Sequence, residues 1–168
     1  MAQPRICVVG ACNIDLISYA PRLPKLGETV PGTRFRMGFG GKGANQAVMA
    51  ARLGGQVTMV AKVGQDIFGE DILRNFAAQG VDATYVTTTA DAATGVAPIW
   101  VEEASGDNAI IVALGANELL SPADIEQARP ALESAQVVVC QWEIQTETVA
   151  AALRLARRAG VLTIFNPA

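Results

Sequence analysis

Four of the six residues in the segment 38–43 are glycine, and a helix-like run follows this segment directly. Because glycine has no Cβ, the backbone N–H groups of such a loop can come close to a ligand. The first N–H groups of the following helix have no partner within the helix and point the same way. Lys42 adds a positive charge and Asn45 adds an amide. The segment therefore predicts a binding site for an anion or a dense group of hydroxyls.

Short continuous apolar runs alternate along the chain with segments of helical periodicity. The chain has 168 residues, of which 51% are hydrophobic and 17% are charged, which is enough for one domain with a real core. Such runs are typical of parallel strands in a sheet that helices cover on both faces. We therefore predict an α/β fold over residues 1–168. Its core strands are expected at 6–9, 56–63, 85–88, 137–140 and 161–165, with helices opening near residues 44, 66, 121 and 146.

Charge and hydropathy exclude several classes of partner. The net charge is −3 and no run of lysine or arginine occurs, so nucleic acid and anionic membranes are poor partners. No stretch of about 18 apolar residues is present, so no segment is expected to span a bilayer. The segment 1–5 leads straight into a strand and does not resemble a secretory signal.

The cysteine and histidine content limits the chemistry further. The three cysteines are not spaced for a metal, and Cys7 and Cys140 lie in strand-like runs. We expect buried thiols in a reducing cytoplasm. The chain has no histidine, so any general base must be a carboxylate, lysine, cysteine or tyrosine.

Two pairs of extended segments are joined without a helix between them. The first pair is 14–20 and 33–39, and the second is 94–102 and 109–114, around the turn residues 105–108. These pairs predict two ribbons that stand off the main sheet. The segment 109–114 is apolar on both faces, so one face is expected to cover the site and the other to meet a partner subunit.

Polar side chains follow the ends of two core strands. Asn13 and Asp15 come just after the first strand, and Glu143 comes just after the strand 137–140. The carboxyl ends of parallel strands share one rim of the sheet, where ligands of open α/β sheets bind. With Lys42 and Asn45, this set suits a small neutral polyol. A local Asx turn at Asn13 and Asp15, and plain solvent exposure of Glu143, remain alternatives.

The glycine segment also satisfies G-x-G-x-x-G, and Asp66 lies 23 residues after Gly43. A dinucleotide-binding domain is therefore a further hypothesis. The fingerprint belongs in the first strand-to-helix turn, however, and Asn13 and Asp15 follow the first strand here. A phosphate-binding Walker loop does not fit, because a glycine rather than serine or threonine follows Lys42.

The sequence resembles the ribokinase branch of the ribokinase/PfkB carbohydrate kinases over essentially its whole length. The most specific match is Gly-Gly-Lys-Gly-Ala-Asn-Gln at 40–46. The other matching segments are 10–15, 24–29, 63–66 with Gly69, 93–95, 115–117, 141–143 and 166–168.

This resemblance implies a parallel α/β core with a small β-sheet lid that also forms a homodimer. It implies transfer of the γ-phosphoryl group of ATP to the 5-hydroxyl of D-ribose, with Mg²⁺ and a stimulating K⁺. The sugar contacts carried over by the resemblance are Asn13, Ile14, Asp15, Gly41, Lys42, Gly43, Ala44, Asn45 and Glu143.

The sequence departs from the family in its second half. The family's catalytic aspartate lies in a Gly-Ala-Gly-Asp segment, and no aspartate here follows Gly-x-Gly, so its counterpart is expected beyond Ala168. The ATP pocket, the Asn-x-x-Glu metal motif and the K⁺ loop of the family have no match either. Strands and helices alternate up to Ala168, so the C-terminal part of the fold is expected to be absent. The chain is predicted to be the sugar-binding half, inactive alone; a non-catalytic sugar-binding or dimerising fragment is the alternative.

Overall fold

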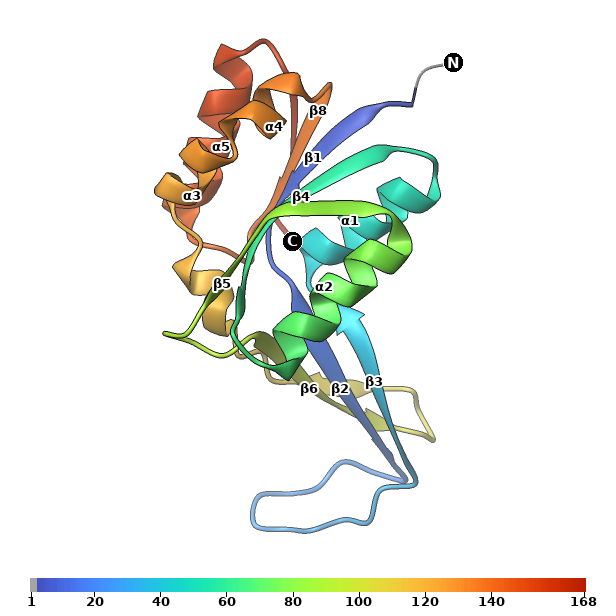
Figure 1. The fold of residues 1–168 in the computed structure, drawn as a ribbon. Helices are drawn as coiled ribbons and strands as arrows, with labels where there is room; N and C mark the ends of the chain where they lie inside the picture. The colour runs from blue at the N-terminus through green and yellow to red at the C-terminus, as the bar shows by residue number, and fades with distance from the viewer. Residues whose placement is uncertain (1–2) are drawn as a thin grey trace.

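The computed structural model describes residues 3–168, which form two sheets and the helices that cover the larger one (Figure 1). The larger sheet has five parallel strands. In spatial order they are β5 (Val81–Thr89), β4 (Gln56–Gly64), β1 (Arg5–Val9), β8 (Val137–Gln141) and β9 (Leu162–Asn166). The predicted parallel α/β core is confirmed.

Apolar residues on both faces of the central strands bury this sheet. Val8 pairs with Met59 and both side chains enter one core cluster, whereas Val9 and Val60 enter the cluster on the opposite face. All four side chains are almost fully buried. A strand that alternates its side chains between two buried faces must be apolar throughout, which is why these strands read as continuous runs.

Helices cover both faces of the large sheet (Figure 1). One face carries α1 (Lys42–Arg52) and α2 (Ile67–Gln79). The other carries α3 (Pro122–Gln127), α4 (Arg129–Ser134) and α5 (Thr146–Arg158), preceded in the chain by the 3₁₀ turn η1 (Gly115–Leu119). No helix among the described residues is both long and apolar enough to cross a membrane.

Two helix starts follow from local capping chemistry. Asp66 caps α2 by accepting a hydrogen bond from the backbone N–H of Gly69, at 2.9 Å. Ser121 and Asp124 form a reciprocal capping box at α3. Both starts agree with the sequence prediction. Helix α1 begins at Lys42, two residues earlier than the expected Ala44.

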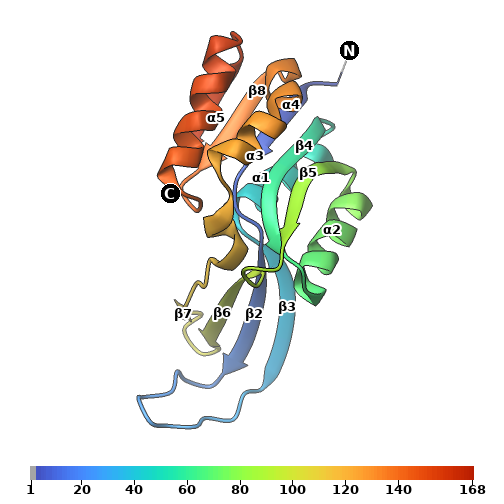
Figure 2. The same cartoon turned by 60° about the vertical axis from the view of Figure 1, so that its left-hand side comes forward.

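The smaller sheet has four strands and projects from the carboxyl end of the larger one (Figure 2). In order they are β3 (Arg34–Gly40), β2 (Asn13–Ala20), β6 (Gly95–Glu102) and β7 (Asn108–Ile110). Both predicted hairpins are present as antiparallel pairs, and β2 pairs with β6 in parallel to join them.

The predicted strand 109–114 is wrong in its extent, because β7 covers only Asn108–Ile110. The register places the next residue, Ile111, opposite Pro98, which has no N–H to donate. The regular ladder therefore ends at this point. Pairing returns only as a single bridge between Val96 and Ala113.

Candidate functional site

The candidate site lies where the two sheets meet. Strand β1 ends at Val9 and the chain passes through a short turn into β2, so one continuous stretch links both sheets (Figure 1). Helix α1 begins beside this turn, directly after β3. The carboxyl end of β8 is on the same rim, because β8 runs parallel to β1.

Gly41 makes the tight entry into α1 possible. Its φ of 87° lies in the left-handed region that favours glycine. A Cβ at this position would also lie 2.6 Å from the carbonyl oxygen of Ala11 and 2.9 Å from the backbone nitrogen of Asn13. Any larger residue would push the start of α1 away from the β1–β2 turn.

Lys42 and Glu143 form a two-point contact at the start of α1. The backbone N–H of Lys42 donates to Glu143 Oε2 at 2.7 Å, and Lys42 Nζ donates to Oε1 at 2.6 Å. The Glu143 side chain is 16% exposed. A carboxylate at a helix N-terminus is favoured by the helix dipole and by the unpaired N–H groups there. The predicted rim residue after β8 is thus held against the glycine segment.

The Asp15 side chain lies over Gly40, the last residue of β3. A Cβ at Gly40 would come within 2.1 Å of Asp15 Oδ1. Burial raises the pKa of Asp15 above its ordinary value, and the negative charge of Glu143 raises it further. Two carboxylates therefore face a shared space, where hydrogen-bond donors of a ligand would be favourable.

Asn13 is buried, with 4% of its surface exposed, and its Oδ1 accepts a hydrogen bond from Asn117 Nδ2 at 2.9 Å. Asn117 lies in the matching segment 115–117, but the sequence did not predict a role for it in the site. The two asparagines are 104 positions apart, so no local pattern joins them.

Gln141 is a second buried amide that sequence reasoning did not assign to the site. It is fully buried, and its Nε2 donates to Gln46 Oε1 at 2.5 Å, which ties the end of β8 to α1. The sequence does contain one indication of this role, because Gln141 is the polar last residue of an otherwise apolar strand.

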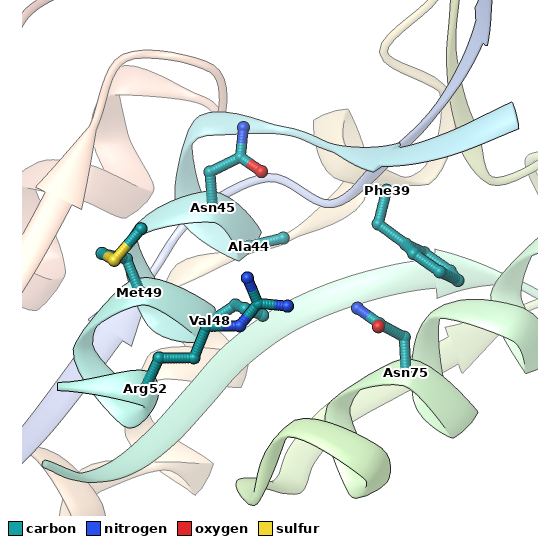
Figure 3. A pocket seen from close by; sticks show the side chains of 7 residues that line it. All are labelled: Phe39, Ala44, Asn45, Val48, Met49, Arg52 and Asn75. Atoms are coloured by element: carbon teal, nitrogen blue, oxygen red, sulfur yellow. The ribbon is translucent and has the colours of Figure 1, made fainter. Parts of the chain in front are cut away.

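The positions of three predicted contact residues limit which of their atoms can contact a ligand. The side chains of Ile14 and Ala44 are buried in the hydrophobic core, so only their backbone atoms can reach a ligand. Asn45 is exposed on the first turn of α1. It lines a hollow of about 340 Å³ between α1, α2 and the end of β3, with its amide turned away from Arg52 (Figure 3).

The dinucleotide hypothesis does not fit this geometry. Gly38 and Gly40 belong to β3, which is antiparallel to β2 in the small sheet and is no part of the parallel core. Asp66 is occupied as a helix cap and as a partner of Thr94. The fingerprint residues therefore lie outside the first strand-to-helix turn that dinucleotide binding requires.

Trp142, next to Glu143, packs in part against the end of β9. Its ring lies 6.1 Å from that of Phe165, and its Nε1 donates to Thr146 Oγ1 at 2.9 Å. The residue is nevertheless 55% exposed.

The end of β9 lies on the same rim of the sheet, where Asn166 pairs in register with Gln141. Ala168 is exposed, and its backbone N–H donates to Asn166 Oδ1 at 3.0 Å, so this segment closes a local turn on itself. The matching motif at 166–168 therefore has no contact with the glycine segment among the described hydrogen bonds. The placement of the family's catalytic aspartate beyond Ala168 stays a prediction.

Comparison with known proteins agrees with the fold. Residues 3–168 match the family model for pfkB family carbohydrate kinases. The chain is 47% identical to ribokinase of Mus musculus over 163 residues, which cover 97% of this chain and 50% of the mouse protein. It is 44% identical to deoxyribokinase of Salmonella typhi, again over 97% of this chain and over 53% of that protein.

Solved structures give the same result. The structure of Arabidopsis thaliana ribokinase complexed with ribose and ATP superposes with a TM-score of 0.85 at 32% identity, over 98% of this chain and 53% of the plant chain. The chain thus spans about half the length of the relatives it matches and corresponds to their N-terminal part. Because the family model covers residues 3–168, the chain belongs to the pfkB family of carbohydrate kinases.

Proposed function

We propose that this chain carries the sugar-binding half of a ribokinase-type enzyme, which phosphorylates D-ribose to D-ribose 5-phosphate with ATP. The observation that carries the proposal is the Lys42–Glu143 pair at the start of α1, together with Asn13 and Asp15 at the start of β2. These groups both donate and accept hydrogen bonds, as the hydroxyls of a sugar require. The ribokinases among the relatives support ribose as the sugar.

Within this proposal the nine expected contact residues divide by the group that they offer. Asn13, Asp15, Lys42, Asn45 and Glu143 would bind hydroxyls through their side chains. Ile14, Gly41, Gly43 and Ala44 would offer only backbone atoms, because the two glycines have no side chain and the other two side chains are in the core.

The transfer step would depend on groups outside this chain. Among residues 3–168, no three histidine, cysteine, aspartate or glutamate side chains gather into a metal-binding group. We propose that the C-terminal half of the family fold, which this chain does not span, would hold Mg²⁺, K⁺ and ATP and would supply the catalytic aspartate. Phosphoryl transfer depends on positioning and charge neutralisation at the γ-phosphate. We infer that the chain alone binds sugar without phosphorylating it.

Calorimetry with D-ribose and a coupled assay for ADP release test these two statements separately. The purified chain should release heat on titration with ribose and form no ADP above background. Glu143→Gln should abolish the heat of ribose binding, because Lys42 and the sugar both lose a charged partner. The control Glu147→Gln, an exposed change on α5, should leave the heat of binding unchanged. ATP-dependent ribose phosphorylation by the chain would refute the predicted inactivity; absence of heat would refute the sugar site.

A second sugar is supported by one specific observation. A relative at 44% identity is named deoxyribokinase, so 2-deoxy-D-ribose is a candidate for the same site. Titrating both sugars under matched conditions distinguishes the two activities. A ribokinase-type site should bind ribose more tightly, because its polar groups lose a partner when a hydroxyl is removed.

We also propose that the small sheet pairs two copies of the chain, and that the protein works in the cytoplasm. Phe35, Met37 and Phe39 alternate along β3 and are 45–59% exposed, which gives one face of this sheet an apolar row. Apolar rows of this kind are typical of association surfaces. Three free cysteines, all buried, suit a reducing compartment.

A further inference from the structure

A buried amide connects the turn η1 to the start of β2. Asn117 is 1% exposed, and its side chain makes four hydrogen bonds. Its Oδ1 accepts from the backbone N–H of Cys12 at 2.8 Å. Its Nδ2 lies 3.1 Å from the carbonyl oxygen of Cys12, 2.8 Å from that of Leu114 and 2.9 Å from Asn13 Oδ1.

These contacts determine which way the Asn117 amide points. A backbone N–H can only donate, so the atom facing the N–H of Cys12 must be the oxygen. Backbone carbonyls can only accept, so the atom facing the carbonyls of Cys12 and Leu114 must be the nitrogen. Turning the amide round would place donor against donor and acceptor against acceptor in a buried space, which is strongly unfavourable.

The orientation of Asn117 then determines the orientation of Asn13. Because Asn117 offers an N–H group to Asn13, the atom of Asn13 that faces it must be the acceptor Oδ1. The Nδ2 of Asn13 therefore points the other way. No described residue within hydrogen-bond distance accepts from it, whereas a sugar hydroxyl in the proposed site could do so.

We propose that Asn117 is a positioning residue that holds the Asn13 amide with its NH₂ group directed into the sugar site. The proposal rests on the sugar-binding function proposed above. Asn13 and Asp15 are two positions apart on β2 and share a face of the small sheet. The site then presents a fixed donor beside an acceptor, and a hydroxyl group can satisfy both at once.

The strand β6 packs tightly against this pair. A Cβ at Gly95 would lie 2.2 Å from Asn13 Oδ1 and 2.3 Å from Asn117 Nδ2. The backbone of β6 therefore excludes water from the hydrogen bond between the two asparagines. Exclusion of water makes an unsatisfied partner costly and keeps the Asn13 amide in one orientation.

The first test needs no sugar. Hydrogen exchange of the side-chain amides can be followed by NMR in the free chain. The Asn117 protons are expected to be protected, and those of Asn13 to exchange at least about tenfold faster because they face the open site. Equal protection of both side chains would overturn the proposed orientation, whether or not the chain binds ribose.

The second test uses ribose binding in a double-mutant cycle. Asn117→Asp replaces the donor by an acceptor, so the Asn13 amide should turn its oxygen toward the site and ribose should bind about tenfold more weakly. In an Asn13→Ala background the same substitution should have no further effect on ribose affinity, because the proposed effect of Asn117 on the sugar passes through the Asn13 amide. Asn108→Asp, an exposed change at β7, is the matched control and should bind as the wild type does.

The outcomes separate the inference from the function on which it rests. A loss of affinity caused by Asn117→Asp in both backgrounds would mean a general structural role and would overturn the inference. If Asn117→Asp does not fold, the exchange rates in the wild-type chain decide. If the wild-type chain releases no heat with ribose, the proposed function fails, and the exchange rates still decide the orientation of Asn13.

Discussion

Gly43 sets the distance between α1 and the β1–β2 turn. A Cβ at this position would lie 2.8 Å from three backbone atoms, the nitrogen and oxygen of Ala11 and the carbonyl carbon of Gly10. Backbone atoms cannot swing aside as a flexible side chain can. The absence of a side chain at this residue therefore determines how closely the helix N-terminus approaches the rim of the sheet.

We expect Gly43→Ala to lower the stability of the chain by about 1–3 kcal/mol through this overpacking, and to abolish the proposed binding of ribose. Gly38→Ala is the matched control, because its nearest new neighbour would be Asp15 Cβ at 3.9 Å. Urea unfolding and calorimetry would measure both effects. Equal stability of the two variants would contradict the packing argument.

The cysteines should be chemically inert in the folded chain. Burial raises the pKa of Cys7 and of Cys140 to about 12, and the pKa of Cys7 is raised also by its neighbours Cys140 and Asp82. Burial raises the pKa of Cys12 as well. Only the thiolate is a nucleophile, so a disulfide reagent at neutral pH should label none of the three thiols until denaturant is added. Rapid labelling of the native chain would show that the core opens.

At the scale of elements, Asp66 connects α2 to the small sheet. Its Oδ1 accepts from the N–H of Gly69 and from Thr94 Oγ1, and its Oδ2 accepts from the N–H of Thr94 at 2.8 Å. Thr94 Oγ1 in turn accepts from the N–H of Gly64, at the end of β4. One carboxylate thus fixes the point where the chain enters β6.

The stability that the Asp66 carboxylate contributes should depend on pH. Burial alone would raise the pKa of Asp66, but the hydrogen bonds from Thr94 and Gly69 outweigh it and lower the pKa below the ordinary value of 3.8. A lowered folded-state pKa gives stability above 3.8 that is lost as the pH falls through the folded value. Asp66→Asn should therefore cost about 1 kcal/mol at neutral pH, because the NH₂ group of asparagine cannot accept a hydrogen bond from Thr94.

The stability difference between wild type and Asp66→Asn should shrink as the pH is lowered below 3.8. Urea unfolding at a series of pH values would measure it. A difference that stays constant in acid would contradict the role assigned to the Asp66 carboxylate.

At the scale of the whole molecule, apolar surfaces remain exposed on both sheets. One is the row on β3 formed by Phe35, Met37 and Phe39. Another lies on β9, the end strand of the large sheet, where Leu162 and Ile164 are 61% and 49% exposed. Exposed apolar faces and open strand edges favour association.

The proposed pairing through the small sheet predicts a specific response to charge. Met37→Lys places a charge in the middle of the row on β3 and should convert dimers to monomers in analytical ultracentrifugation. Leu26→Lys is the control, because Leu26 is fully exposed in the loop before β3 and outside the row. If the two variants sediment alike, the row on β3 is not the association surface.

Much of this architecture could be predicted because it depends on local pattern. The apolar runs gave the core strands, and Asp66 and Ser121 gave helix starts through capping chemistry. Both hairpins of the small sheet followed from turn residues between extended segments. The early end of β7 could not be predicted, because it depends on which residue of β6 lies opposite. The sequence of the segment 109–114 does not show that Pro98 is its neighbour.

The sequence by itself determined the fold class, the family and the glycine segment with its polar companions on the rim. Only the tertiary structure decided which side chains reach that rim. Ile14 and Ala44 turn into the core, Lys42 pairs with Glu143 across 101 positions, and Asn117 orients Asn13 across 104. Hydrophobic periodicity and capping act within a few residues, whereas the direction of a buried amide depends on donors and acceptors that meet only after the two sheets have packed.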